Sequence, residues 1–151
     1  MLTLTPIEDF EALDAIYADP WVSKVGHDHR PASPIKHPAA RYLGAYVHGK
    51  LVGAFLIIES GFIDVDMHAL LLRRAVAWSR EFGRMCLDNI FANPVIERVN
   101  ALVLEGLESA LNYAVKIGFK PEGFRRNAAM RDGKLVGIYM LGITRAEWGA
   151  L

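Results

Sequence analysis

The sequence has very little cysteine, no excess of charge of either sign and no long apolar run. Its single cysteine, Cys86, has no mate in the chain, which excludes an internal disulfide and favours a reducing compartment. Seventeen basic residues balance seventeen acidic ones, so no overall field attracts the protein to nucleic acid or to a membrane surface. No segment approaches the roughly 18 apolar residues of a membrane-spanning helix, and no secretory signal pattern opens the sequence. We therefore expect a cytoplasmic protein whose partner is a small molecule or a protein.

The length and apolar content indicate one domain. The 151 residues, 52% of them apolar, suffice to bury one substantial core but are few for two domains. Neither an internal repeat nor a linker divides the chain. We therefore expect a single domain over residues 1–151.

The N-terminal pattern predicts a short strand followed by a helix. Leu2–Leu4 is the strand candidate. Thr5 is a suitable helix cap, Pro6 suits the first helical position, and Glu8 completes a capping box. The helix should end before Pro20, because the residue that precedes a proline is disfavoured in the helical region.

The segment 21–40 lacks periodicity and is interrupted by prolines, so we expect an irregular arm. His27, Asp28, His29 and His37 gather in it. A His-x-His pattern alone has low specificity for metal, and no third ligand follows at a convincing spacing. We therefore expect no metal here, and interpret the arm as a solvated loop or one wall of an acceptor pocket.

The rest of the chain alternates strands and helices. Tight turns are expected at His48-Gly49 and Asp132-Gly133, where glycine allows positive φ. Gly118 is well placed as a left-handed helix cap. The expected strands are 42–47, 51–58, 62–72, 98–104, 119–130 and 135–143, and the expected helices are about 78–93 and 105–117. This order predicts a mixed sheet with helices on its faces.

A basic corner joins the strand 62–72 to the next helix. Arg73 and Arg74 stand where that helix should begin, and their positive charge opposes the helix dipole. The first-turn amides of a helix have no partner inside the helix, so a bound anion would explain the arginines. We interpret the corner as a phosphate site in which the amides between Ala75 and Ser79, helped by Arg74, are free to bind a diphosphate.

The order of elements and the residues near the end of the chain resemble the GCN5-related N-acetyltransferase (GNAT) superfamily. The most specific match is the segment 117–125, Ile-Gly-Phe-Lys-Pro-Glu-Gly-Phe-Arg, followed by 132–135, Asp-Gly-Lys-Leu, and by the closing strand with Trp148 behind it. His68 and the segment 141–148 are similar to GNAT-like proteins common in phage and prophage genomes. The resemblance implies an α/β (α+β) fold, with a mostly antiparallel sheet of about seven strands splayed between strands 4 and 5 and helices on both faces.

The resemblance also implies acetyl-CoA as cofactor, held in the cleft between strands 4 and 5. Its pantetheine arm would follow the fourth strand, and its diphosphate would lie on the basic corner. The residues implied in cofactor binding are Met67, Ala69, Leu70, Arg73, Arg74, Ala75, Val76, Ala77, Trp78 and Ser79. The family pattern Gln/Arg-x-x-Gly-x-Gly/Ala falls on Arg74 to Ser79, with Ala77 and Ser79 where glycines are usual.

The family reaction is direct attack of an amine on the thioester, which needs a base, oxyanion donors and a proton for the thiolate. His68 is the first candidate base, because imidazole titrates near neutral pH. Asp66 and Glu59 are candidates that act through water. The family's tyrosine acid falls on Ala114, so its neighbour Tyr113 is the remaining candidate acid.

Two interpretations stay open. The first is an acetyl-CoA-dependent N-acetyltransferase that acts on an amine of a small molecule or a protein, which Arg74 and His68 favour. The second is a catalytically inactive GNAT-fold protein, phage-related and structural, binding or regulatory. The altered loop, the displaced tyrosine and Leu107, where an asparagine is frequent, favour it. A homodimer through the apolar strand Gly137–Ile143 is also expected as an option.

Overall fold

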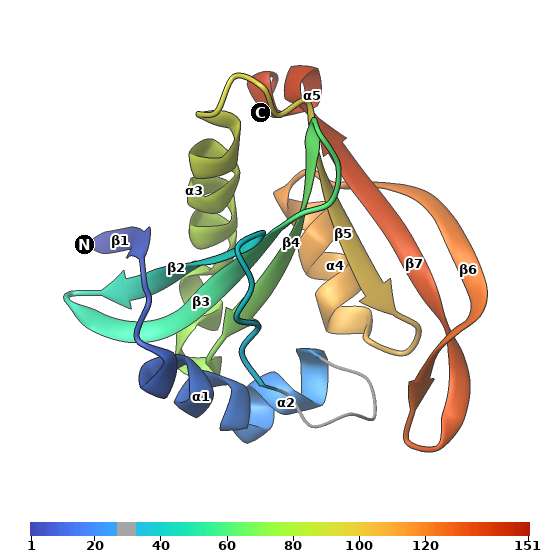
Figure 1. Cartoon of the computed structure of the whole chain (residues 1–151), viewed down its shortest axis with the longest axis horizontal. Coiled ribbons are helices and arrows are strands. Elements are labelled where there is room, and N and C mark those ends of the chain that lie inside the picture. Colours follow the sequence, from blue (N-terminus) through green and yellow to red (C-terminus); the bar gives the residue numbers. More distant parts are fainter. Residues whose placement is uncertain (27–32) are drawn as a thin grey trace.

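The computed structural model describes residues 1–26 and 33–151, in which seven strands form one mixed sheet (Figure 1). The strands are β1 (Leu2–Pro6), β2 (Ala40–Val47), β3 (Lys50–Glu59), β4 (Asp64–Leu71), β5 (Arg98–Leu104), β6 (Lys120–Arg131) and β7 (Lys134–Thr144). The helices are α1 (Phe10–Ala18), α2 (Pro20–Gly26), the 3-10 helix η1 (Arg73–Trp78), α3 (Ser79–Phe91), α4 (Glu108–Ile117) and α5 (Arg145–Gly149). The predicted sheet of about seven strands is therefore confirmed.

The sheet order is β1-β2-β3-β4-β5-β7-β6, and of its neighbouring pairs in the described chain only β4 and β5 run parallel. These two strands are paired only from Asp64 to Asp66, opposite Arg98 to Asn100. Beyond that point they diverge, as Figure 1 shows. The predicted splay between strands 4 and 5 is confirmed.

Helices cover both faces of the sheet, as predicted. On one face α1 and α2 bury Leu13, Ile16 and Val22 against Leu56, Leu70 and Leu72. On the other face α3 and α4 bury a larger cluster that includes Phe82, Cys86, Ile90, Ile117, Phe55, Met67, Val99 and Ile143. The thiol of Cys86 is fully buried, and burial raises its pKa.

The predicted tight turns are confirmed. His48 and Gly49 have φ of 49° and 81°, and Asp132 and Gly133 have φ of 51° and 75°. Two consecutive residues at positive φ make the reversal whose twist matches that of the flanking strands. Gly118, at φ 118°, is the left-handed cap of α4, also as predicted.

The predicted start of the first helix is wrong. Thr5 and Pro6 belong to β1 and pair with β2, so the backbone of this segment is used by the sheet. Asp9 caps α1 instead, since its side chain accepts a hydrogen bond from the amide of Ala12 at 3.1 Å.

The prediction that the whole segment 21–40 is irregular is wrong, because Pro20–Gly26 forms the helix α2. The Asp19 carboxylate accepts hydrogen bonds from the amides of Trp21 and Val22, at 2.9 and 3.4 Å. Pro20 thus ends α1 and begins α2, since proline suits a first helical position. The cluster His27, Asp28 and His29 lies outside the described residues.

Candidate functional site

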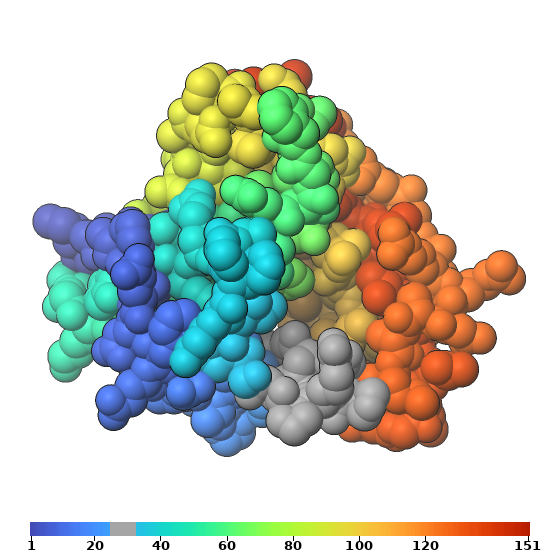
Figure 2. All heavy atoms as spheres, viewed as in Figure 1, coloured from blue at the N-terminus to red at the C-terminus, as the bar shows by residue number. Residues whose placement is uncertain are grey.

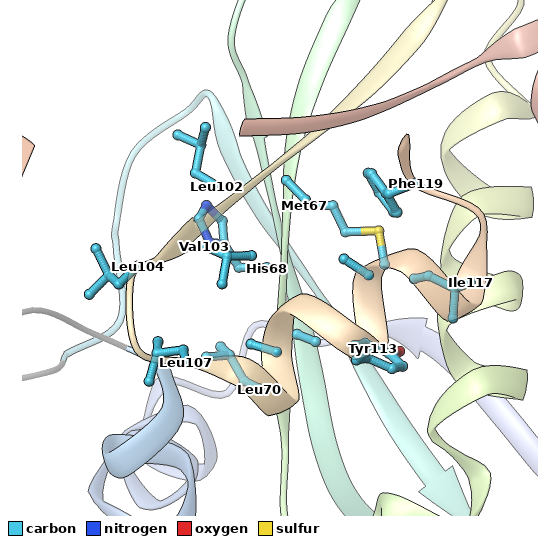
Figure 3. A pocket seen from close by; sticks show the side chains of 14 residues that line it. Met67, His68, Leu70, Leu102, Val103, Leu104, Leu107, Tyr113, Ile117 and Phe119 are labelled. Carbon is cyan, nitrogen blue, oxygen red and sulfur yellow. The ribbon is translucent and has the colours of Figure 1, made fainter. Parts of the chain in front are cut away.

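A cleft opens where β4 and β5 separate, and α4 lines one side of it (Figure 3). Its space is about 690 Å³, with open solvent at the mouth included. The lining is apolar apart from His68 and Tyr113, and it comes from β4 (Met67, His68, Ala69, Leu70), β5 (Ala101, Leu102, Val103, Leu104) and the region of α4 (Leu107, Ala110, Tyr113, Ala114, Ile117, Phe119). Three predicted cofactor residues, Met67, Ala69 and Leu70, therefore lie in it.

The backbone of β4 gives the cleft a polar edge. From Met67 to Leu71 this strand pairs with β3 but not with β5. Alternate backbone groups of a strand point to opposite sides, so those that face β5 are left without a strand partner. An extended ligand with amide groups fits such an edge. In the space-filling view the β5 segment lies between the N-terminal half of the chain and the C-terminal hairpin (Figure 2).

His68 is, with Tyr113, a titratable residue of the cleft lining. Its half-buried side chain lines the cleft (Figure 3). Within residues 1–26 and 33–151 no group hydrogen-bonds to the imidazole. Burial lowers the pKa of His68, and the negative charge of Asp66 opposes that shift. Burial therefore favours the neutral imidazole, which is the form that can accept a proton.

Asp66 belongs to a polar network at the closed end of the cleft. Asn100 donates its amide hydrogens to Asp64 at 2.7 Å and to Asp66 at 3.0 Å, and its oxygen accepts from Arg98 at 2.8 Å. Arg98 in turn forms a two-pronged ion pair with Glu122 of β6. Sequence reasoning missed this network because it depends on the register of β5 with β4 and β7, which no local pattern specifies.

Glu59 does not join His68. It pairs with Val65, whose side chain is buried on the α3 face of the sheet, whereas His68 pairs with Leu56, which is buried on the α1 face. Side chains of paired residues share a face, so Glu59 and His68 project from opposite sides of the sheet. Glu59 is exposed and lines a different hollow, beside Asn93.

Tyr113 lines the cleft, but its hydroxyl points toward α3. The phenol donates a hydrogen bond to the carbonyl oxygen of Ser79 at 2.7 Å. Burial raises the pKa of Tyr113. Ala114, at the position where the resemblance implies a tyrosine, is buried and also lines the cleft. α4 begins at Glu108, three residues later than predicted, with Leu107 as its cap.

Both arginines of the basic corner are exposed and have protein partners. Arg74 donates to the carbonyl oxygen of Leu51 at 3.0 Å. The guanidinium of Arg73 stacks over the ring of Trp21, 5.5 Å from its centroid. The corner thus carries two cations at the surface, next to the end of β4 that borders the cleft.

The backbone of the corner differs from the prediction. A 3-10 helix, η1, precedes α3, so the α-helix begins at Ser79 and not at the arginines. The amide of Ala75 donates to the carbonyl of Leu72 at 2.8 Å, and the amide of Ser79 donates to Val76. The expectation that all amides from Ala75 to Ser79 are free is therefore wrong. The side chain of Ala75 is also fully buried, whereas Val76 and Ala77 are exposed.

Comparison with solved structures decides the fold. The spermidine N-acetyltransferase of Vibrio cholerae, solved with CoA and spermine, superposes with a TM-score of 0.84 over 97% of each chain, at 15% identity. The chain has the GNAT fold. A second protein of the GNAT fold, a provisionally assigned phosphinothricin N-acetyltransferase, gives a TM-score of 0.78 over 95% of this chain and 98% of that one, at 20% identity. At such identities the likeness establishes the GNAT fold alone.

The sequence comparisons add one relative. No family model matches the chain. Protein gp14 of Salmonella phage P22 is 23% identical, over 82% of this chain and 80% of that protein. The phage similarity expected from the sequence is thus present, though weak.

No helix within the described residues is long and apolar enough to cross a membrane. No three His, Cys, Asp or Glu side chains of residues 1–26 and 33–151 are grouped to hold a metal ion.

Proposed function

We propose that the protein is an N-acetyltransferase that moves an acetyl group from acetyl-CoA to an amine, and that residues 1–151 are one acyl-CoA-binding domain. The observation that carries the proposal is His68, unpartnered by any described residue, in the apolar cleft that opens where β4 leaves β5. The solved GNAT neighbour that contains CoA supports this choice of cofactor.

The cofactor would bind along β4 and around the basic corner. Its pantetheine amides would pair with the free backbone edge between Met67 and Leu70, and its diphosphate would lie against Arg73–Ser79. The side chain of Arg74 donates a hydrogen bond only to an exposed backbone carbonyl. Replacing this hydrogen bond with one to a phosphate oxygen would therefore cost little free energy. The hydrogen bond between the guanidinium and a phosphate is charge-assisted on both sides and is therefore stronger than the bond to the neutral carbonyl.

The chemistry would be a direct transfer. The amine nitrogen forms a bond to the thioester carbonyl carbon, and the C–S bond then breaks to release the CoA thiolate. His68 takes the proton that the attacking ammonium loses, directly or through a water molecule, and Asp66 stabilises the resulting imidazolium. Tyr113 can donate a proton to the thiolate only after its hydroxyl leaves the Ser79 carbonyl. Glu59 would act only through water around the edge of the sheet.

The acceptor we propose is an amine of a small molecule or a protein. The solved neighbours named for spermidine and phosphinothricin support a small amine. The strand proposed for a dimer interface, β7, lies between β5 and β6, and Ile138–Gly142 is paired with both neighbours, so over this stretch only side chains are available to a second copy.

A second candidate is a catalytically inactive protein of the same fold, structural, binding or regulatory in a phage-related setting. The bonded amides of Ala75 and Ser79 favour it, because glycines and free amides are what usually let backbone approach phosphate. The similarity to the phage protein gp14 agrees with it.

Thermal unfolding with CoA separates the two candidates. A ligand at 100 times its Kd adds about 2.7 kcal/mol to the stability of the native state, so Tm should rise by several degrees. Acetyl transfer to a panel of amines, followed by thiol release, tests the chemistry, and His68→Gln should lower kcat by roughly 100-fold or more. His48→Asn is the matched control, since His48 is exposed in the β2–β3 turn at positive φ and does not line the cleft. Binding of CoA without turnover would favour the second candidate. If Tm does not change at millimolar CoA, the proposal that the protein is an acetyltransferase is excluded.

A further inference from the structure

The hydroxyl of Tyr113 joins two helices at the edge of the basic corner. It donates to the carbonyl of Ser79, which is the first residue of α3 and directly follows η1. Figure 3 shows the phenol directed toward α3 and away from His68. The bond therefore fixes the residue at which the corner ends, and leaves the hydroxyl at a distance from the candidate base.

Gly83 provides the space for this contact. A Cβ atom at Gly83 would lie 2.6 Å from the Tyr113 hydroxyl and 3.0 Å from the Cδ1 atom of Ile117. No side chain other than hydrogen at position 83 leaves the phenol in place. The pairing of a tyrosine on α4 with a glycine one turn into α3 thus makes a close and specific contact between the two helices.

The corner is held at both ends. At its start the amide of Leu72 donates to the carbonyl of Val52 at 3.0 Å, which ties the corner to β3. At its end Tyr113 holds Ser79. Between these two points the arginines contact other elements only by exposed side chains.

We propose that Tyr113 is a positioning residue for diphosphate binding, which holds the segment Arg73–Ser79 in place through the Ser79 carbonyl, and that it does not supply the proton to the leaving thiolate. The inference rests on the proposed function, since it concerns how the same site binds its cofactor. It assigns to Tyr113 a task at the phosphate end of the cofactor and not at the thioester end.

Two acyl donors test the assignment on Tyr113→Phe. Acetyl-CoA carries the diphosphate, whereas S-acetylpantetheine has the same thioester and pantetheine arm without it. In the variant, KM for acetyl-CoA should rise roughly five-fold, the value of about one hydrogen bond, with kcat and its pH profile unchanged. KM for S-acetylpantetheine should not change. Tyr139→Phe is the matched control, because Tyr139 packs on Phe124 and does not line the cleft.

Other results overturn the proposal. A fall in kcat of roughly 100-fold with loss of the basic limb of the pH profile would make Tyr113 the acid. If KM rises equally for acetyl-CoA and S-acetylpantetheine, Tyr113 has no specific role in binding the diphosphate.

Hydrogen exchange of the ligand-free protein gives a reading independent of turnover. The amides of residues 80–83 should exchange faster in Tyr113→Phe than in Tyr139→Phe. If wild type binds no CoA, the proposed function fails, while the exchange result still decides whether Tyr113 holds the corner. Equal exchange in the two variants would contradict the positioning role.

Discussion

Asn100 donates a hydrogen bond to Asp66 across the last paired residues of β4 and β5, with the amide nitrogen and carboxylate oxygen 3.0 Å apart. The same amide nitrogen also reaches Asp64, so a neutral group holds two carboxylates in place. The amide therefore holds the Asp66 carboxylate on the face of β4 where His68 is the next residue. The carboxylate and the half-buried imidazole interact electrostatically, and their coupling is measurable.

Asp66→Asn should move the acid limb of kcat/KM to lower pH. The base must be neutral to accept a proton, and the Asp66 charge raises the pKa of His68 against the effect of burial. Without that charge the pKa falls further. NMR titration of the His68 ring should show the same direction without any need for turnover. Asp64→Asn, which alters the other carboxylate on the Asn100 amide, should move the limb less. An equal or opposite movement would contradict the coupling.

The stability of the native state should depend on His68 below neutral pH. Burial lowers the pKa of the folded His68 below the unfolded value of about 6.5. The unfolded chain then binds the proton more readily, so stability is complete above about pH 6.5 and is lost as the pH falls toward the folded pKa. Urea unfolding between pH 7 and 5 should give a flatter dependence in His68→Gln than in wild type. A His68→Gln variant that keeps the wild-type slope would refute the argument.

The corrected start of α1 gives a direct comparison of two caps. Asp9→Ala should lower the free energy of unfolding by about 1 kcal/mol, because the Ala12 amide loses its partner. Thr5→Ala should change it by no more than about 0.5 kcal/mol, since Thr5 is an exposed residue of β1. Chemical denaturation measures both, and the opposite ranking would restore the original prediction.

The contact between Gly83 and Tyr113 should show as coupling in a double-mutant cycle. Gly83→Ala gains roughly 1 kcal/mol in helix propensity, but its methyl group meets the phenol hydroxyl. In the Tyr113→Phe background that hydroxyl is gone, so Gly83→Ala should be more favourable there by about 1 kcal/mol. In the Tyr139→Phe background its effect should be additive. If the effect of Gly83→Ala on the free energy of unfolding is additive in both backgrounds, the hydroxyl of Tyr113 does not limit the packing of the two helices.

Local chemistry explains which parts of the fold were predictable from sequence. The two hairpins are specified by glycines at positive φ, and α4 ends where Gly118 permits it. α5 was missed although its signal is present, since Thr144 and Glu147 form a complete capping box. The first helix was misplaced because Thr5 and Pro6 carry a good cap signal that pairing with β2 overrides.

The candidate site was predictable only in part. The family resemblance pointed to His68 and to Met67, Ala69 and Leu70, all on one strand, and the structure places these residues in the cleft lining. Arg98, Asn100 and Glu122 come from strands brought together by register, and no spacing in the sequence announces them. The 3-10 form of the corner follows from the fully buried Ala75 and its bond to Leu72, which are properties of packing and not of pattern.

The burial of Cys86 has a practical consequence at the bench. The only cysteine of the chain is inaccessible in the larger core, and burial raises the pKa of its thiol, so the reactive thiolate is suppressed. A thiol-reactive dye added to the folded protein will therefore report on free coenzyme A without a background from the polypeptide. The same dye gains one site per chain only when the protein unfolds, so a single reagent reports both turnover and loss of structure.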